Sequence, residues 1–306
     1  MKLTLFTLLV LSTICFVSCR KNASNIDIKQ FDQQQIQNYI AANGITGMQR
    51  DLTNGDTTGI YYKIINPGDP AKQVDYPDSI NFVYTARTFD GKYAILDTVL
   101  NHYSGLLGNV IPNGLMLSIH NLLKYKGGKI RVLIPSHLAY GQKGVGSGSS
   151  TVANNKIAGN ECLDYTVNLI DDQAAYDDLV LKNYIAANNL TGFTKMTTGI
   201  APGTYYKIKT AGTGGIINDN TNLSCNFTLL LMNNSIADSA IVATANFPDF
   251  VALTPGARAG LEMVKAGSDI VLLVPSRYAY GTTATGSAPA NACLKFEFYN
   301  ITVTNY

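Results

Sequence analysis

The chain has 306 residues, of which 46% are hydrophobic and 14% are charged, and its formal net charge is +2. This composition is apolar enough for buried cores and too poor in charge for a disordered chain, and the length indicates two domains of ordinary size. Because no cluster of Lys and Arg stands out, the sequence gives nucleic-acid binding no electrostatic support.

The N-terminus has the features of a secretory signal peptide: a positive start and an apolar run too short to span a membrane. The run ends in Phe-Val-Ser-Cys at 16–19, which resembles the lipobox of bacterial lipoproteins. We therefore expect 1–19 to be a lipoprotein signal, Cys19 to carry the lipid and 20–27 to be a linker. The protein would then be exported and anchored to a membrane of the bacterial cell envelope, facing the periplasm or the surface. An ordinary signal peptide that happens to contain two cysteines is the alternative.

The rest of the chain contains one module twice. Three pairs of matching segments recur in the same order, at spacings from 140 to 145 residues: Asn-Tyr-Ile-Ala-Ala-Asn at 38–43 and 183–188, Tyr-Tyr-Lys-Ile at 61–64 and 205–208, and Ile/Val-Pro-Ser at 134–136 and 274–276. A period of this length is a domain and not a solenoid unit. We call the two modules repeat 1 (28–171) and repeat 2 (172–306).

Hydrophobic periodicity predicts the elements within each repeat. In repeat 1 these are a helix at 31–42, strands at 61–65 and 80–85, an internal helix at 115–125, and strands at 129–134 and 163–169. In repeat 2 they are a leading helix at 176–187 and an internal helix at 258–265. Many strands with one internal helix per repeat predict an α+β fold with antiparallel sheets.

Three cysteines remain after the signal segment, namely Cys162, Cys225 and Cys293. Each lies in an apolar, strand-like run, so we expect buried free thiols and not disulfides. The three histidines show no metal-ligand spacing, and we expect neither a metal nor a cofactor.

The second half of each repeat contains an ordered set of short motifs. In repeat 1 they are Gly-Gly-Lys at 127–129, Ile-Pro at 134–135, Leu-Ala-Tyr-Gly at 138–141, Ile-Ala-Gly-Asn at 157–160 and Leu-Asp-Tyr at 163–165. In repeat 2 they are Val-Pro at 274–275, Tyr-Ala-Tyr-Gly at 278–281, Ala-Pro-Ala-Asn at 288–291 and Leu-Lys-Phe at 294–296. This order resembles the FKBP-type peptidyl-prolyl cis-trans isomerase family, in tandem degenerate copies.

The resemblance implies that each repeat is a five-stranded antiparallel sheet wrapped on a short helix, preceded by an N-terminal helix. A pocket lined by aromatic side chains would lie between helix and sheet. It also implies isomerase or folding-helper activity on proline-containing polypeptides without any cofactor. The sequence gives no indication of the oligomeric state.

The same resemblance assigns site residues in repeat 1. It implies catalytic roles for Tyr84, Asp97 and Tyr140. It implies substrate-binding roles for Leu96, Val110, Ile111, Ile157, Tyr165 and a pocket floor at Leu115 or Leu117. Counting from 110 favours Leu115 and counting back from 127 favours Leu117, so both remain candidates. The family has Trp at this floor, whereas this chain contains no Trp.

Repeat 2 departs further from the family pattern. Its matching residues are Phe227, Asp238, Ala257, Tyr280 and Phe296. Because Phe227 has lost a hydroxyl and Ala257 stands where the floor Trp belongs, we expect a pocket that is shallow or filled by other side chains.

The resemblance and the departures from it leave two hypotheses for the function. The first is a prolyl isomerase or folding helper of the cell envelope, with activity mainly in repeat 1 and with repeat 2 inactive. The second is a non-catalytic binding or scaffold lipoprotein that keeps the fold and has lost the aromatic pocket.

Overall fold

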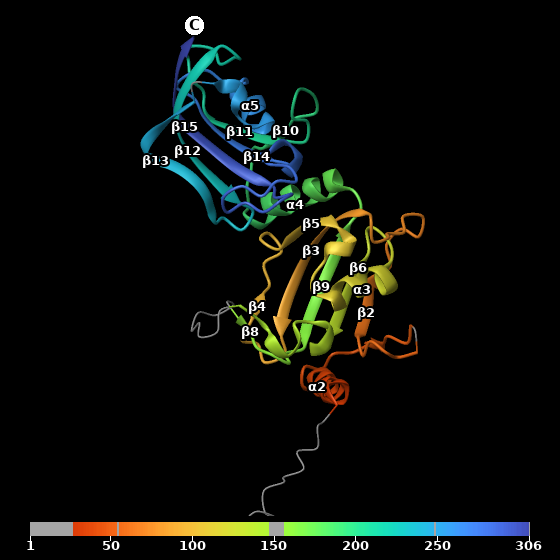
Figure 1. Cartoon of the computed structure of the whole chain (residues 1–306). Helices are drawn as coiled ribbons and strands as arrows, with labels where there is room; N and C mark the ends of the chain where they lie inside the picture. The colour runs from red at the N-terminus through yellow and green to blue at the C-terminus, as the bar shows by residue number, and fades with distance from the viewer. Residues whose placement is uncertain (1–26, 54, 147–155, 248, 306) are drawn as a thin grey trace, which may run out of the picture.

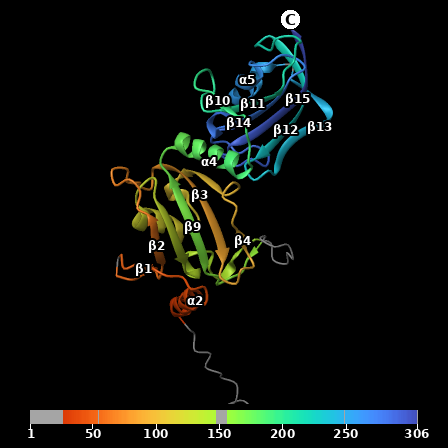
Figure 2. The same cartoon turned by 180° about the vertical axis from the view of Figure 1, so that it is seen from behind.

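The computed structural model describes residues 27–53, 55–146, 156–247 and 249–305. Their fold is a mixed α+β arrangement of two large antiparallel sheets, one in each sequence repeat, as the hydrophobic pattern predicts. Helix α4 (Gln173–Ala187) follows the first sheet and lies between the two sheets in both views (Figures 1 and 2). Asp172 caps its N-terminus by accepting hydrogen bonds from two backbone N–H groups.

The first sheet has seven strands. In spatial order they are β1 (Gln49–Arg50), β2 (Tyr61–Asn66), β6 (Lys129–Ile134), β9 (Leu163–Ile170) and β3 (Ser79–Thr88), and beside β3 lie both β4 (Ala94–Ile95) and β5 (His102–Leu106). The four strands expected from the sequence are all present. The expected count of five is corrected, because a two-residue edge strand is added and the other edge strand is interrupted over 96–101.

The second sheet repeats this order with six strands. They are β10 (Thr194–Lys195), β11 (Tyr205–Thr210), β14 (Asp269–Val274), β15 (Leu294–Asn305), β12 (Thr221–Leu231) and β13 (Ile236–Phe247). A separate two-stranded sheet in repeat 1 joins β7 (Val145–Gly146) to β8 (Lys156–Ile157). The shared strand order lets each position of one sheet be matched to a position of the other.

The helices lie where the sequence predicts them, but their bounds differ from the predicted ones. Helix α2 (Ile28–Ala42) precedes the first sheet and lies at its far end from α4 (Figure 1). The internal helix of repeat 1 is α3 (Asn113–Leu117), followed by a π-helical turn over Ser118–Leu123. It ends before 125 because Lys124 adopts a positive φ of 68° and its N–H bonds back to Ile119.

The internal helix of repeat 2, α5 (Pro255–Leu261), ends before the expected residue 265. Pro255 occupies the first turn, where its missing N–H costs nothing. The Thr254 side chain accepts a hydrogen bond from the Ala257 N–H, which fixes the start.

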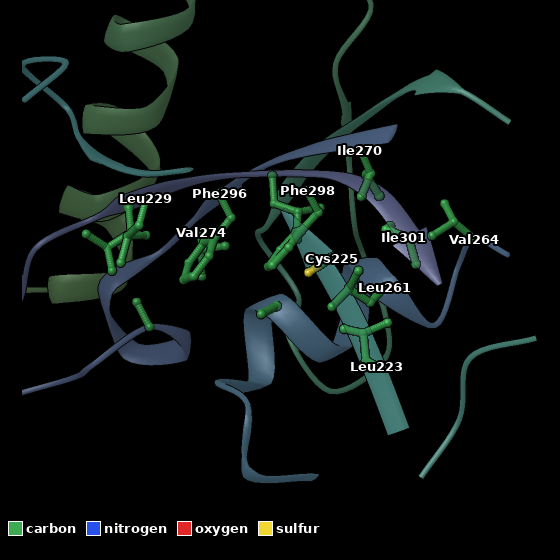
Figure 3. Close-up of a cluster of buried hydrophobic side chains, with 14 of the residues drawn as sticks. Leu223, Cys225, Leu229, Leu261, Val264, Ile270, Val274, Phe296, Phe298 and Ile301 are labelled. Atoms are coloured by element: carbon green, nitrogen blue, oxygen red, sulfur yellow. The ribbon is translucent and has the colours of Figure 1, made fainter. Parts of the chain in front are cut away.

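Each internal helix covers a hydrophobic core on one face of its sheet. In repeat 2 the labelled side chains of β12, β14 and β15 lie between the sheet and α5 (Figure 3). Cys162, Cys225 and Cys293 are buried free thiols, which confirms the prediction made from their surroundings.

No helix among the described residues is long and apolar enough to cross a membrane. The signal segment and the predicted lipidation site Cys19 lie outside the described residues.

Candidate functional site

The start of the internal helix is built in the same way in both repeats. A Cβ added at Gly114 would lie 2.4 Å from Ile134 Cγ2, and one at Gly256 would lie 2.2 Å from Val274 Cγ1. Since only glycine allows this close approach of helix and strand, the two glycines mark equivalent positions. The residues that follow them, Leu115 and Ala257, are therefore counterparts.

This equivalence decides between the two candidates for the floor in repeat 1. Leu115 is 2% exposed and belongs to the core of repeat 1. Leu117 is half-buried and does not belong to that core. The structure thus favours Leu115 over Leu117 as the counterpart of Ala257.

A cavity of about 180 Å³ lies between α5 and the second sheet. It is lined by Phe227, Leu229, Asp238, Phe247, Ala252, Leu253, Thr254, Ala257, Tyr280, Phe296 and Phe298. All five residues that the sequence matched in repeat 2 are among them. The sequence predicted a pocket that is either shallow or filled by other side chains; the structure has a cavity here, and the single methyl group of Ala257 lines it.

The walls of this cavity are mainly aromatic. Phe296 and Phe298 stack with ring centroids 5.7 Å apart, and Phe227 lies 6.4 Å from Phe298. Figure 3 shows Phe296 and Phe298 on the side of the sheet that faces the helix. An apolar wall of this kind suits a small apolar ring.

Two polar groups reach the same cavity. Burial, and then the nearby Asp238 carboxylate, raises the pKa of the Tyr280 hydroxyl. The hydroxyl therefore stays protonated at neutral pH and can donate a hydrogen bond to a carbonyl group. Asp238 itself accepts a hydrogen bond from the Ser239 N–H.

The corresponding part of repeat 1 is a cluster of tyrosines. The rings of Tyr84 and Tyr165 lie 6.0 Å apart, and Tyr140 lies near the Tyr165 hydroxyl. Burial, and then the charges of Tyr93 and Tyr140, raises the pKa of Tyr84. The family resemblance accounts for three of these rings and does not include Tyr93, which directly precedes β4. The only sequence feature that could have indicated Tyr93 is its spacing of two residues from Ile95, which faces the core.

The remaining apolar candidates of repeat 1 divide into two groups. Val110 and Ile157 are 3% and 2% exposed and pack in the core with the tyrosine cluster. Ile111 is 73% exposed, and the role that the resemblance implies for it belongs to its backbone N–H, not to its side chain.

The structure does not bring Leu96 and Asp97 to the tyrosine cluster. Ile95 faces the core, so its neighbour Leu96 points to the opposite face of the sheet, where it lies with Arg87. Asp97 Oδ2 accepts a hydrogen bond of 2.5 Å from Asn233 Nδ2 of repeat 2. The interrupted edge strand thus carries both residues away from the tyrosine cluster, beside which the resemblance had placed them.

This interrupted segment joins the two repeats. Val99 packs against core side chains of repeat 2. The backbone of Ala290 and the carboxylate of Asp177, both in repeat 2, lie near the buried His102. A small cavity of about 60 Å³ remains beside these groups.

Within the described ranges, no group of three or more His, Cys, Asp and Glu side chains is arranged to hold a metal ion.

Comparison with known proteins gives two related sequences. An FKBP-type peptidyl-prolyl cis-trans isomerase FkpA of Buchnera aphidicola is 27% identical over 132 residues, which cover 42% of this chain and 51% of the relative. The protein of the same description from Aeromonas hydrophila is 30% identical over 118 residues, covering 38% of this chain and 42% of the relative. The chain thus spans about half the length of the curated relatives it matches. No family model matches the chain.

Solved structures give weaker likenesses. The crystal structure of FkpA from Escherichia coli has a TM-score of 0.38 and 23% identity, covering 43% of this chain and 61% of the other. The three FKBP domains of wheat FKBP73 have a TM-score of 0.32 and 17% identity, covering 85% and 98%. These scores are too low to carry an argument. The sequence matches, together with the ordered motifs, relate the chain to the FKBP-type peptidyl-prolyl cis-trans isomerase family.

Proposed function

We propose that this chain binds proline-containing polypeptides and accelerates rotation about their X-Pro bonds. The observation that carries the proposal is the cavity of about 180 Å³ in repeat 2, which joins aromatic walls to a protonated tyrosine hydroxyl. Rotation about a peptide bond must cross a barrier of about 18–20 kcal/mol that arises from amide resonance. The twisted transition state has lost that resonance and its carbonyl is less polar, so an apolar, dry pocket favours it over the planar ground state.

The cavity supplies what this mechanism needs without a nucleophile or a metal. The Phe227, Phe296 and Phe298 rings provide apolar surface for a pyrrolidine ring. The Tyr280 hydroxyl can orient the carbonyl that precedes the proline. The relatives described as FKBP-type isomerases support this reading.

The proposal extends to the whole chain as two tandem FKBP-like units, 28–171 and 172–306. The equal strand order of the two sheets and the shared helix start support this division. It also includes export and membrane anchoring through Cys19, for which the 16–19 motif is the support.

The share of each repeat in the activity is open to a direct test. The sequence predicts that activity lies mainly in repeat 1, in the set Tyr84, Asp97 and Tyr140. The cavity favours repeat 2 as the place where a prolyl ring fits. Asp97 accepts a hydrogen bond from Asn233 of repeat 2, so a substitution at Tyr140 is the better test of repeat 1.

The test is a prolyl isomerisation assay on X-Pro peptides with the full chain and two matched variants. Tyr280→Phe and Tyr140→Phe each remove one hydroxyl and keep the ring. A larger loss from Tyr280→Phe supports the cavity as the site, and a larger loss from Tyr140→Phe supports the sequence-based assignment. If neither variant lowers a measured wild-type activity, neither tyrosine acts as proposed.

A non-catalytic binding role is the second candidate. One observation favours it: the chain contains no Trp for the pocket floor. In that case proline-containing peptides bind to the full chain, Ala257→Leu abolishes the binding, and no isomerisation is measured.

A further inference from the structure

A second groove lies on the opposite face of the first sheet, away from the core and the tyrosine cluster. Its volume is about 400 Å³, and Arg87, Arg131 and Asp164 line it together with Ile65 and Leu96. The two aliphatic side chains are 51% and 59% exposed. The groove thus combines two guanidinium groups with apolar walls.

A buried carboxylate holds the two arginines in place. Asp164 Oδ1 accepts from Arg131 Nε at 3.0 Å, and Oδ2 accepts from Arg131 Nη2 at 2.7 Å. The same Oδ2 accepts from Arg87 Nε and Nη2 at 3.1 and 3.0 Å. Tyr39 of α2 adds a hydrogen bond of 2.9 Å to Asp164. Because these bonds fix the guanidinium planes in advance, a ligand need not order them.

One carboxylate cannot neutralise the positive charge of this face. On the strands β2, β3, β6 and β9, the charged side chains that alternate away from the core are Lys63, Arg87, Lys129, Arg131 and Asp164, which gives 4 − 1 = +3. Lys63 and Arg131 are directly opposite each other in the register of β2 and β6, so two positive charges are neighbours there. The Arg87 side chain remains 40% exposed toward solvent.

The same positions of repeat 2 carry a different surface. The strand registers match Arg87 to Leu230 and Asp164 to Lys295. Lys295 there forms an ion pair of 2.8 Å with Glu297, so the pair is neutral. The paired arginines are therefore a property of repeat 1 and not a general feature of the repeated fold.

We propose that this groove binds an acidic side chain of an extended polypeptide, with a neighbouring aliphatic residue of that polypeptide against Ile65 and Leu96. Asp164 uses two of the five N–H donors of each guanidinium, so the remaining donors can bind a second carboxylate, and the surplus positive charge attracts an acidic segment. The aliphatic walls on either side of the arginines favour a peptide over a bare anion. This inference does not depend on prolyl isomerisation, since it concerns the other face of the sheet.

The test measures binding of a fluorescein-labelled peptide of alternating Glu and Leu to the full chain by fluorescence anisotropy. Arg87→Leu installs the residue that repeat 2 has at this position, and Asp164 keeps its bonds to Arg131 and Tyr39. We expect it to weaken binding about tenfold, equivalent to about 1.4 kcal/mol. The matched control is Lys207→Leu, which removes one positive charge at the position of repeat 2 that corresponds to Lys63, and we expect it to leave binding unchanged.

A second variant keeps the test independent of Asp164. Leu96→Glu places a negative charge on the exposed wall and should also weaken binding about tenfold. Equal effects of Arg87→Leu and Lys207→Leu, or equal binding of a peptide with Lys in place of Glu, overturn the proposal. Binding of anionic phospholipid vesicles without binding of the acidic peptide overturns it as well, in favour of a membrane-facing surface.

Discussion

Replacing Leu115 with alanine tests the assignment of the pocket floor. Repeat 2 shows what an alanine leaves at this position, because Ala257 is the counterpart of Leu115 and lines an empty cavity. Leu115 itself is 2% exposed in the core of repeat 1. The substitution should therefore open a smaller cavity at the corresponding place in repeat 1.

The cost of this cavity follows from its size. Removing a buried leucine side chain beyond its Cβ costs about 2–5 kcal/mol, rising by about 24 cal/mol for each Å³ of cavity left. The three carbon atoms removed leave a void smaller than the 180 Å³ cavity of repeat 2, so the cost should lie in the middle of this range. We expect the free energy of unfolding to fall by about 3–4 kcal/mol, since partial collapse of the site reduces the void.

The assay is urea unfolding followed by circular dichroism, because the chain contains no Trp to report by fluorescence. At an m-value of about 2 kcal/mol per M, the midpoint of the affected transition should fall by roughly 1.5–2 M. Leu117→Ala is the control, and it should cost less than about 1 kcal/mol because that side chain is half-buried outside the core.

The reciprocal change fills the cavity of repeat 2. Ala257→Leu adds three carbons, which at about 0.8 kcal/mol each should stabilise repeat 2 by up to about 2 kcal/mol. A cost below 1 kcal/mol for Leu115→Ala, or a larger cost for Leu117→Ala, would refute the equivalence of Leu115 and Ala257.

Three further predictions concern the ends and the junction of the repeats. Cys19→Ala should release the protein from the membrane fraction of expressing cells, and unchanged sedimentation with membranes would contradict the lipid anchor. Burial lowers the pKa of His102, so its neutral form is favoured in the folded chain; the free energy of unfolding should fall as the pH drops below about 6.5, and His102→Gln should remove that part of the pH dependence. Burial opposes ionisation of Asp32, but hydrogen bonds from His137 and Ser136 outweigh burial and lower the pKa of Asp32. The stabilisation by this carboxylate is therefore present above about pH 4 and is lost in acid. Asp32→Asn should cost about 2 kcal/mol at pH 7 in urea unfolding and much less at pH 3, and equal costs at both pH values would show that the carboxylate charge contributes nothing.

The local alternation of side chains was enough to predict much of the fold. Strand β6 (Lys129–Ile134) has the predicted bounds, because every second residue must enter the core. The internal helix of repeat 1 was placed correctly, but its end was not, since Lys124 turns away for reasons that a hydrophobic pattern does not contain. The repeated motifs likewise predicted the paired order of elements.

The site itself depended on contacts that sequence spacing does not specify. The choice of Leu115 over Leu117 required the close approach of Gly114 to Ile134, because an altered segment length makes two counts along the chain disagree. Leu96 and Asp97 matched a family motif, yet an interruption of the edge strand turned one to the outer face and the other to the second repeat.

The sequence by itself determined the internal repeat, the antiparallel sheets, the buried thiols and the similarity to FKBP-type isomerases, because local periodicity and ordered motifs encode them. Only the tertiary structure decided that repeat 2 holds an open cavity and that Arg87 and Arg131 converge on Asp164 across three strands. Cavities and charge clusters arise from packing between segments that are distant in the chain. Their volume and charge depend on all the neighbours at once, and no single motif records them.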